Sequence, residues 1–354
     1  MEKLNIPLLS TICKTAAPPG FEQRLRQFVE SEVRPLVDDC FTDALGNLYA
    51  VRKGSGQGPK KKIMVAAHLD EIGFIVTHIE DGGFLRFHTL GGFDPKTLSS
   101  QRVIVHGKKD IVGVMGSKPI HLMSAAERGK SLGIKDYFID TGMSKEELEK
   151  YVSVGDPISR ERELIEMGDC VNSKSLDNRL AVFILLECLR ELKEEQLDYD
   201  VYGVFTVQEE VGLRGARVAA HNINPDFGLG LDITIAFDVP GAQAHEKITA
   251  LGAGTAIKIM DGSSICDYRM VQFMKEAADA AEIPWQPEIL TGGGSDTGGL
   301  QLYGKSGAIT GAISIPCRHV HQTVEMAHKE DIYQSIQLLK QCLLNIPKYD
   351  WSFR

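Results

Sequence analysis

The hydrophobic pattern of the chain changes character twice, and this change constrains the fold more than any other feature. Helical and extended patterns alternate up to residue 70 and again from Gly168 to the end. Between them lie short β-branched runs such as IGFIVTHI and RVIVHG, separated by Gly, Asp and Lys turns, as in small barrels and sandwiches. The sequence therefore predicts an α/β domain formed by residues 1–70 and 163–354, interrupted by a β-rich insertion at 71–162. The two ends of an insertion lie close together, which places residues 67–70 beside 168–177.

Periodicity and turn signals predict the elements of the α/β part. Strands are predicted at 48–51, 63–67, 199–207, 227–231, 256–260, 285–290 and 308–314. Helices are predicted at 6–15, 22–37, 180–192, 214–221, 264–281 and 328–344. In the insertion, strands are predicted at 72–79, 84–90, 102–107 and 110–116, followed by partial helix signals over 125–150.

The charge and the cysteines exclude several classes of protein. The 354 residues carry a formal net charge of −9, which argues against a surface for nucleic acid or anionic membrane. No apolar run approaches the ~20 residues of a spanning helix, and the beginning lacks signal-peptide features, so we expect a cytoplasmic protein. The seven cysteines are scattered and form no C-x-x-C pair. Any metal would therefore be held by His, Asp and Glu.

Polar side chains gather where predicted strands end. In open α/β sheets, ligands bind outside the carboxyl ends of the strands. The candidates at such ends, or just before a helix, are His68, Asp70, Asp177, Glu209, Glu210, Asp232, His319 and His321. So much negative charge in a partly desolvated crevice repels itself unless cations lie among the carboxylates.

This donor set favours particular metals. Imidazole and carboxylate ligands without a thiolate suit zinc, or cobalt or manganese, better than calcium or magnesium. The number of donors fits two ions about 3.5 to 4 Å apart that share a carboxylate and a water, as in hydrolytic two-metal sites.

The segment VQEEVG places two glutamates side by side after an apolar run. If residues 201–207 form a strand, consecutive side chains point to opposite faces. Glu209 and Glu210 are then expected to have different roles.

Five motifs occur in a fixed order between residues 68 and 325, namely HLDEIGF, SLDNR, QEEVGLRGA, LDIT and CRHVHQTVE. Together with PPGFE and DALGN near the start, they resemble the two-metal aminopeptidases of the glutamyl and tetrahedral aminopeptidase family. The resemblance implies a three-layer αβα zinc-peptidase domain with an inserted small β-barrel that mediates dimer contacts. It also implies removal of single residues from peptides with a free N-terminus, by homodimers that assemble into a hollow dodecamer.

The resemblance also assigns roles to residues. It implies that His68 and Asp232 hold one ion, that Glu210 and His321 hold the other, and that Asp177 bridges the two. Asp70 corresponds to the carboxylate that orients the imidazole of His68, and Glu209 to the general base that activates the bridging water.

Some positions depart from the family pattern or leave alternatives open. Residues two apart in a strand share a face, so His319 competes with His321 as a ligand, although we favour His321. Asp296 in GGGSDTGG is a candidate for holding the substrate's amino group, and Asp238 in AFDVPG is a weaker one. Asp177 before a helix also fits an N-cap.

Three rival functions remain at this point. Paired carboxylates also cleave glycosidic bonds, as in endoglucanases, but that chemistry needs no imidazole and only two Trp are present as sugar platforms. A deacylase or carboxypeptidase on the same fold is a second rival. A non-catalytic scaffold is the third, although it would have no use for a glutamate free of metal such as Glu209.

Overall fold

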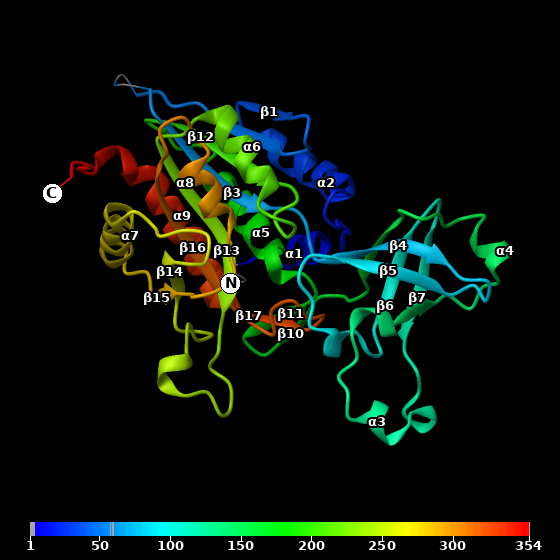
Figure 1. Ribbon diagram of the computed structural model, residues 1–354. Coiled ribbons are helices and arrows are strands. Elements are labelled where there is room, and N and C mark those ends of the chain that lie inside the picture. Colours follow the sequence, from blue (N-terminus) through cyan, green and yellow to red (C-terminus); the bar gives the residue numbers. More distant parts are fainter. Residues whose placement is uncertain (1–3, 57, 59, 354) are drawn as a thin grey trace.

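The larger part of the molecule is built on one twisted sheet of 11 strands (Figure 1). The computed structural model describes residues 4–56, 58 and 60–353. Four parallel strands form the centre, in the order β12 (Asp200–Thr206), β3 (Lys62–His68), β13 (Phe227–Ile235) and β16 (Ile309–Arg318). Antiparallel strands extend it on both sides: β2 (Leu48–Arg52) and β1 (Asp39–Thr42) beside β12, and β17 (Glu325–His328), β11 (Cys170–Ser173) and β10 (Ile165–Met167) beside β16. Strand β14 (Thr255–Met260) branches antiparallel from β16 and pairs with β15 (Trp285–Ile289).

Helices cover both faces of this sheet, because its central strands are apolar on both sides. In β3, Ile63, Val65 and Ala67 belong to the core under α5 (Leu176–Glu191), whereas Met64 and Ala66 pack with α6 (Arg214–Ile223). This alternation is the period of two expected of a buried strand. The layer of helices that contains α5 also includes α1 (Ile6–Lys14), α2 (Gln23–Val33), α7 (Tyr268–Ala280) and α9 (Lys329–Asn345). The layer on the opposite face contains α6 and α8 (Asp296–Leu302). The predicted three-layer α/β architecture is confirmed.

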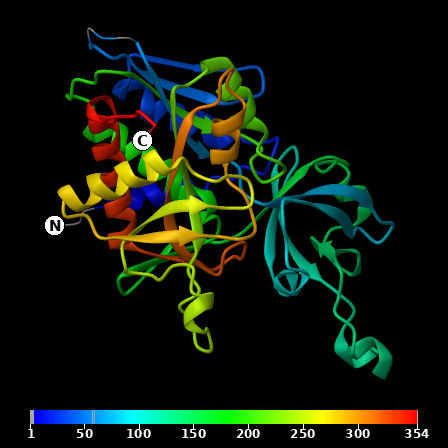
Figure 2. The same ribbon diagram turned by 60° about the vertical axis from the view of Figure 1, so that its left-hand side comes forward.

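A closed six-stranded barrel stands beside this domain (Figures 1 and 2). Its strands follow the order β4 (Gly73–Ile79), β5 (Leu85–Leu90), β8 (Phe138–Asp140), β7 (Asp110–Gly116), β6 (Arg102–His106) and β9 (Pro157–Arg160). It has a core of its own, which includes Phe74, Val103 and Ile139. All six strands lie inside the range 71–162, and the segment with the short helix α3 (Ala125–Arg128) projects away from the barrel in both views. A second short helix, α4 (Lys145–Leu148), precedes β9.

The elements that sequence patterns missed are short or rich in glycine. Strand β10 is exposed at all three residues and β1 at three of its four, so neither shows a clear apolar alternation. Helix α8 contains Gly298 and Gly299, which are poor helix formers. The predicted helix over 264–281 begins only at Tyr268, because the Asp267 side chain caps it by accepting from the Arg269 N–H. Within the described residues, none of the helices combines the length and the apolar character needed to cross a lipid bilayer.

A buried ionic cluster joins the two points where the chain enters and leaves the barrel. Glu71 follows β3, and its carboxylate lies 2.6 Å from Lys174 Nζ and 3.2 Å from Arg179 Nη2, while also accepting the Ala17 N–H. None of the three charged side chains is more than 3% exposed. Burial alone would raise the pKa of Glu71, but the two cations lower it from 4.5 to about 2. The cluster thus places the outgoing chain beside the returning one, as the insertion requires.

Replacement of Glu71 by Gln is expected to destabilise the protein strongly, because it leaves two buried cations without their counter-ion. Breaking a buried pair in this way costs roughly 3 to 5 kcal/mol. Urea unfolding of the metal-free protein measures the change. The matched control is Glu163→Gln, whose carboxylate pairs with Lys14 at 3.1 Å with both side chains about 70% exposed. That control should change the stability little, because exposed pairs contribute little.

The same cluster predicts a pH dependence. Because the pKa of Glu71 is lower in the folded chain, its ionised form stabilises the fold above the ordinary pKa of 4.5, and this contribution is lost as the pH falls toward about 2. The difference in unfolding free energy between the natural chain and Glu71→Gln should therefore narrow from about pH 5 to about pH 3. A constant difference would contradict the assigned ionisation.

Candidate metal centre

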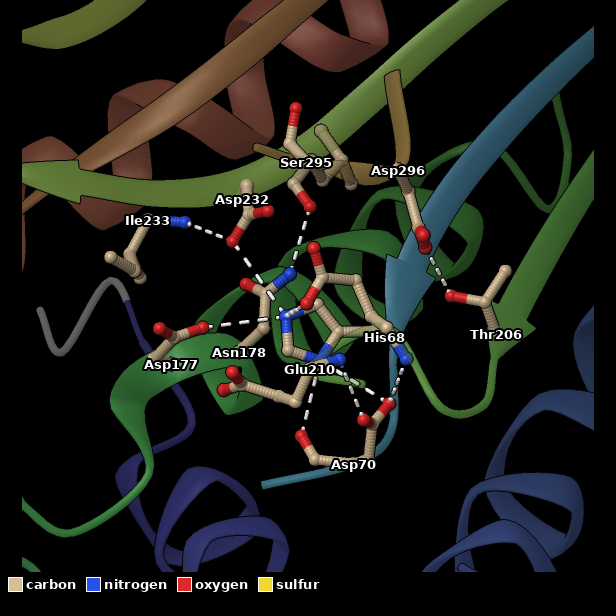
Figure 3. Close-up of polar contacts among 12 residues, drawn as sticks. His68, Asp70, Asp177, Asn178, Thr206, Glu210, Asp232, Ile233, Ser295 and Asp296 are labelled. Carbon is tan, nitrogen blue, oxygen red and sulfur yellow. Dashed lines mark hydrogen bonds and ion pairs between the residues drawn. The ribbon is translucent and has the colours of Figure 1, made fainter. Parts of the chain in front are cut away.

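Six predicted side chains meet at the carboxyl end of the central strands, and Figure 3 shows most of them. His68 is the last residue of β3, and Asp232 lies in β13 two residues after Gly230, which pairs with Ala66 of β3. Glu209 and Glu210 follow β12, His321 follows β16, and Asp177 lies at the start of α5. The backbone of Asp177 (φ −78°, ψ 105°) is not helical, but its side chain does not act as a plain helix cap, because its carboxylate oxygens lie beside the two imidazoles.

Asp177 occupies the central position. One of its carboxylate oxygens lies 3.3 Å from His68 Nε2 and the other lies 3.2 Å from His321 Nε2. Each imidazole has further carboxylates of its own: His68 Nε2 is 3.8 Å from both Asp232 and Glu209, and His321 Nε2 is 3.6 Å from Glu210. Donor atoms of His68, Asp177 and Glu210, and separately those of His68, Glu209 and Asp232, lie close enough together to hold an ion.

The electrostatics of the centre fit positive ions among these groups. Burial, followed by repulsion from Asp177 among other carboxylates, raises the pKa of Glu210 and of Asp232 to about 8. Burial also raises the pKa of Glu209 well above its ordinary range. One oxygen of Glu210 is buried without a hydrogen-bond donor. Carboxylates arranged in this way bind protons or cations, and the imidazole and carboxylate donors match what divalent transition metals prefer.

The two imidazoles respond in the opposite sense. Burial by itself lowers the pKa of both side chains, but the surrounding carboxylates raise the pKa of His68 well above 6.5 and that of His321 to about 9. A divalent cation would take the place of these protons, since metal ligands bind in their deprotonated forms.

The expected strand alternation at Glu209 and Glu210 is wrong. Strand β12 ends at Thr206, and Gln208 adopts a left-handed backbone (φ 56°), so both glutamates lie in a turn. Their backbone N–H groups both donate to the Asp70 carboxylate, one to each oxygen at 3.0 Å. The side chains still have different neighbours, since Glu209 approaches His68 and Glu210 approaches His321. The turn, and not strand alternation, therefore directs the side chains of Glu209 and Glu210 to different neighbours.

Asp70 contacts the imidazole of His68, as predicted, and it also holds the turn that carries the two glutamates. The Nδ1 atom of His68 lies 3.1 Å from the backbone oxygen of Asp70 and 3.6 Å from its carboxylate. The backbone oxygen is thus the nearer partner of the imidazole, while the carboxylate mainly fixes the turn that carries Glu209 and Glu210.

Glu325 holds the main chain of two other residues of the centre in the same way, and the sequence did not predict this role. Its fully buried carboxylate accepts the backbone N–H of Asp177 at 3.0 Å and that of His321 at 2.9 Å. Burial raises the pKa of Glu325 to about 7, although the nearby Arg160 lowers it. The only signal in the sequence is its place at the end of CRHVHQTVE, four residues after His321.

Three other predicted positions do not meet the centre in the expected way. Strand β16 ends at Arg318, so His319 and His321 do not share a strand face; His319 is exposed and His321 contacts Asp177. Asp296 is buried and accepts a hydrogen bond from Thr206 (Figure 3). Asp238 forms a bidentate pair with Arg318, with both distances 2.6 Å. Neither aspartate lines the cavity beside the centre, and this arrangement does not support the predicted contacts with a substrate amine.

That cavity measures about 730 Å³ and reaches from the centre to the barrel. The side chains of the centre form its floor, and Gly92, Phe93 and Asp94 come from the barrel side. Its remaining wall is mostly apolar, with Leu213, Ile233, Ile235, Leu290 and Val320.

A serine, a histidine and an aspartate also form a hydrogen-bonded chain in the barrel. His106 Nδ1 lies 2.8 Å from Asp110, and its Nε2 lies 2.8 Å from the Ser159 hydroxyl. Ser159 is only 1% exposed, so no substrate reaches it. Because Arg24 of α2 also pairs with Asp110 at 2.9 Å, the group ties the barrel to the larger domain.

Comparison with known proteins agrees with this fold. The model of the M42 glutamyl aminopeptidase family matches residues 46–338, and the chain belongs to this family. Family membership implies binding of divalent metal. A "Putative aminopeptidase" of Acetivibrio thermocellus is 42% identical over 325 residues, covering 92% of this chain and 94% of that protein.

Three solved structures are informative. The TET aminopeptidase from Thaumarchaeota archaeon SCGC AB-539-E09 has a TM-score of 0.93 and 36% identity, with 96% of both chains covered. The Pyrococcus horikoshii TET1 peptidase, described as able to assemble into a tetrahedron or a large octahedral shell, has a TM-score of 0.85 and 31% identity over 96% of this chain and 99% of that one. A Thermotoga maritima structure titled endoglucanase has a TM-score of 0.78 and 29% identity over 95% and 96%.

The role of Glu325 can be tested by Glu325→Gln. The amide keeps the size of the side chain but offers one acceptor oxygen where Asp177 and His321 now use two. We expect metal affinity to fall by about 10- to 100-fold, as when other groups that orient ligands are removed. Competition with a metal-sensitive dye measures the affinity.

Glu166→Gln is the control, because Glu166 lies on β10, two strands away in the same sheet, and its side chain pairs with Lys329 on the surface. It should bind metal as the natural chain does. Unchanged affinity in Glu325→Gln, with circular dichroism confirming the fold, would refute the role.

Proposed function

We propose that the protein is a two-metal aminopeptidase that removes N-terminal residues from peptides. The observation that carries the proposal is the Asp177 carboxylate, which directs one oxygen to each of two imidazoles that have further carboxylates beside them. In this assignment His68 and Asp232 hold one divalent ion, Glu210 and His321 hold the other, and Asp177 is shared. Zinc suits this donor set best, and cobalt or manganese are chemically close.

Glu209 is assigned as the general base. Bound divalent ions supply Lewis acidity, which polarises a carbonyl and makes water more acidic. Glu209 is 8% exposed and lies beside His68 and Asp232, within reach of an ion held there, and the assignment leaves it free of metal to act on water. Its position and the raised pKa of its carboxyl group suit a group that accepts a proton from water and passes it to the leaving amine. Asp70 holds Glu209 in place through its backbone N–H.

The barrel is proposed to mediate assembly into a homo-oligomer, with residues 71–162 as the oligomerisation domain. Residues 71–162 expose five large apolar side chains, and four of them lie on β7 and the segment that follows it, namely Val112 (56%), Val114 (48%), Ile120 (61%) and Leu122 (71%). Exposed apolar groups in one region mark contact surfaces. The TET1 peptidase, whose chain is similar, assembles into a tetrahedron or a large octahedral shell, which supports dimers that assemble into a dodecamer for this protein.

A glycosidase is the weaker alternative, although one similar structure is titled endoglucanase. Acid and nucleophile carboxylates of that chemistry do not require imidazoles. Here both histidines lie within 3.3 Å of the Asp177 carboxylate, and glycoside cleavage has no need for two imidazoles at this position.

Removal of metal tests the class of reaction. Treatment with a chelator is expected to abolish hydrolysis of aminoacyl p-nitroanilides, and zinc, cobalt or manganese should restore it. N-acetylation of the same substrates should also abolish hydrolysis, because the proposed site requires a free amine. Release of p-nitroaniline is followed by absorbance. Chelator-resistant cleavage of a soluble glucan would instead support the glycosidase. Release of acetate from the acetylated substrates would support a deacylase, and cleavage of an N-acetylated peptide with a free C-terminal carboxylate would support a carboxypeptidase.

The two neighbouring glutamates give a matched pair of variants. Glu209→Gln should bind metal normally but lose about 10²- to 10⁴-fold in kcat, the usual contribution of a general base. Glu210→Gln should lose metal affinity together with activity. Elemental analysis and initial rates separate the two outcomes. Normal turnover by Glu209→Gln at full metal content would refute its role.

A further inference from the structure

The wall of the cavity next to Asp232 is apolar. Strand β13 carries Asp232 and continues through Ile233 and Ile235, both of which line the cavity. Leu290, which follows β15, lines the same cavity with the glycines 292–294. Ile235 is 38% exposed, so its side chain is open to a ligand. A substrate whose amine lies at the centre has this wall as a neighbour for its first side chain.

The cavity has a single lysine and no arginine along its described lining, and that lysine is already neutralised. Lys258 of β14 is 1% exposed, and its ammonium lies 3.0 Å from Asp261 and 3.4 Å from Glu288. Both of these carboxylates are completely buried. A carboxylate on the substrate would be a third negative group around one ammonium, and it would lose its hydration without gaining a free cation.

A basic side chain also lacks a partner on this wall. Outside the centre, Asp94 is the one carboxylate along the described lining. It belongs to the barrel segment that includes Gly92, where an added Cβ would lie 3.5 Å from His321 Nδ1. Asp94 therefore lies on the His321 side of the cavity, whereas Ile235 and Leu290 line the side next to Asp232. An ammonium placed against the apolar wall would be buried without a counter-charge.

We propose that this wall is the subsite for the first side chain of the peptide and that it selects uncharged apolar residues over acidic and basic ones. Ile235 and Leu290 form its surface, and Lys258 lies beneath it as a structural ion rather than as a recognition group. The inference rests on the proposed aminopeptidase function. It differs from the glutamyl preference in the name of the matching family.

The test compares leucyl, glutamyl and lysyl p-nitroanilides with the metal-loaded protein. The kcat/KM for the leucyl substrate should exceed the other two by at least about tenfold, the scale of discrimination by an apolar pocket. Leu290→Lys places an ammonium in the subsite, so the leucyl-to-glutamyl ratio of kcat/KM should fall by about tenfold or more.

The control is Ile289→Lys, which adds the same charge one residue earlier. Ile289 is 51% exposed and does not line the cavity, so this variant should keep the natural ratio. Ile235→Lys gives a second variant in the subsite should Leu290→Lys not fold, and the same fall in the ratio is expected.

The possible outcomes distinguish a failure of the apolar subsite from a failure of the aminopeptidase function. A preference for the glutamyl or the lysyl substrate would overturn the apolar subsite and leave the aminopeptidase function intact. An unchanged ratio in both lysine variants of the subsite would also overturn it. If none of the three substrates is cleaved with any divalent metal, then the proposed function itself fails.

Discussion

The candidate centre depends on two buried carboxylates that hold backbone rather than ions. Asp70 accepts the N–H groups of Glu209 and Glu210, and Glu325 accepts those of Asp177 and His321. Four of the six converging side chains are therefore fixed through their own main chain. Charge-assisted hydrogen bonds of this kind are strong in a low-dielectric interior, and they hold groups that would otherwise repel one another. The ligand oxygens can thus remain close together before any ion arrives.

The barrel is part of the same construction and not merely an appendage. The chain leaves the sheet immediately after His68 and Asp70, and the Glu71 cluster fastens that exit to Lys174 and Arg179. Only a few residues then separate Lys174 from Asp177 at the centre. A barrel segment near Gly92 also borders the cavity beside His321. The insertion consequently shapes the space in which a peptide would lie, whatever it contributes to assembly.

The sequence predicted those features that depend on local pattern and residue type. The parallel strands were predictable from apolar runs, and the donors of the centre from His and carboxylate residues where those runs end. Features set by contacts distant in sequence were not. Glu325 meets Asp177 across 148 positions, and Glu71 meets Lys174 across 103. No periodicity in the sequence indicates contacts between residues so far apart. The strand model for Glu209 and Glu210 failed because the left-handed backbone at Gln208 is a tertiary choice that a non-glycine residue rarely makes.

Charge balance connects the centre with the wall beside it. Asp177, Glu209, Glu210 and Asp232 carry four negative charges when ionised, and two divalent ions carry four positive ones. With the two divalent ions of the proposed assignment, the centre would be close to neutral and would provide no surplus field to attract a charged first side chain. Lys258 is already offset by Asp261 and Glu288, so it leaves no positive charge to attract an acidic side chain. With no free cation to pair with an acidic side chain and no carboxylate on the apolar wall to pair with a basic one, selection on this wall is left to the removal of apolar surface from water, which favours aliphatic side chains and penalises ionised ones.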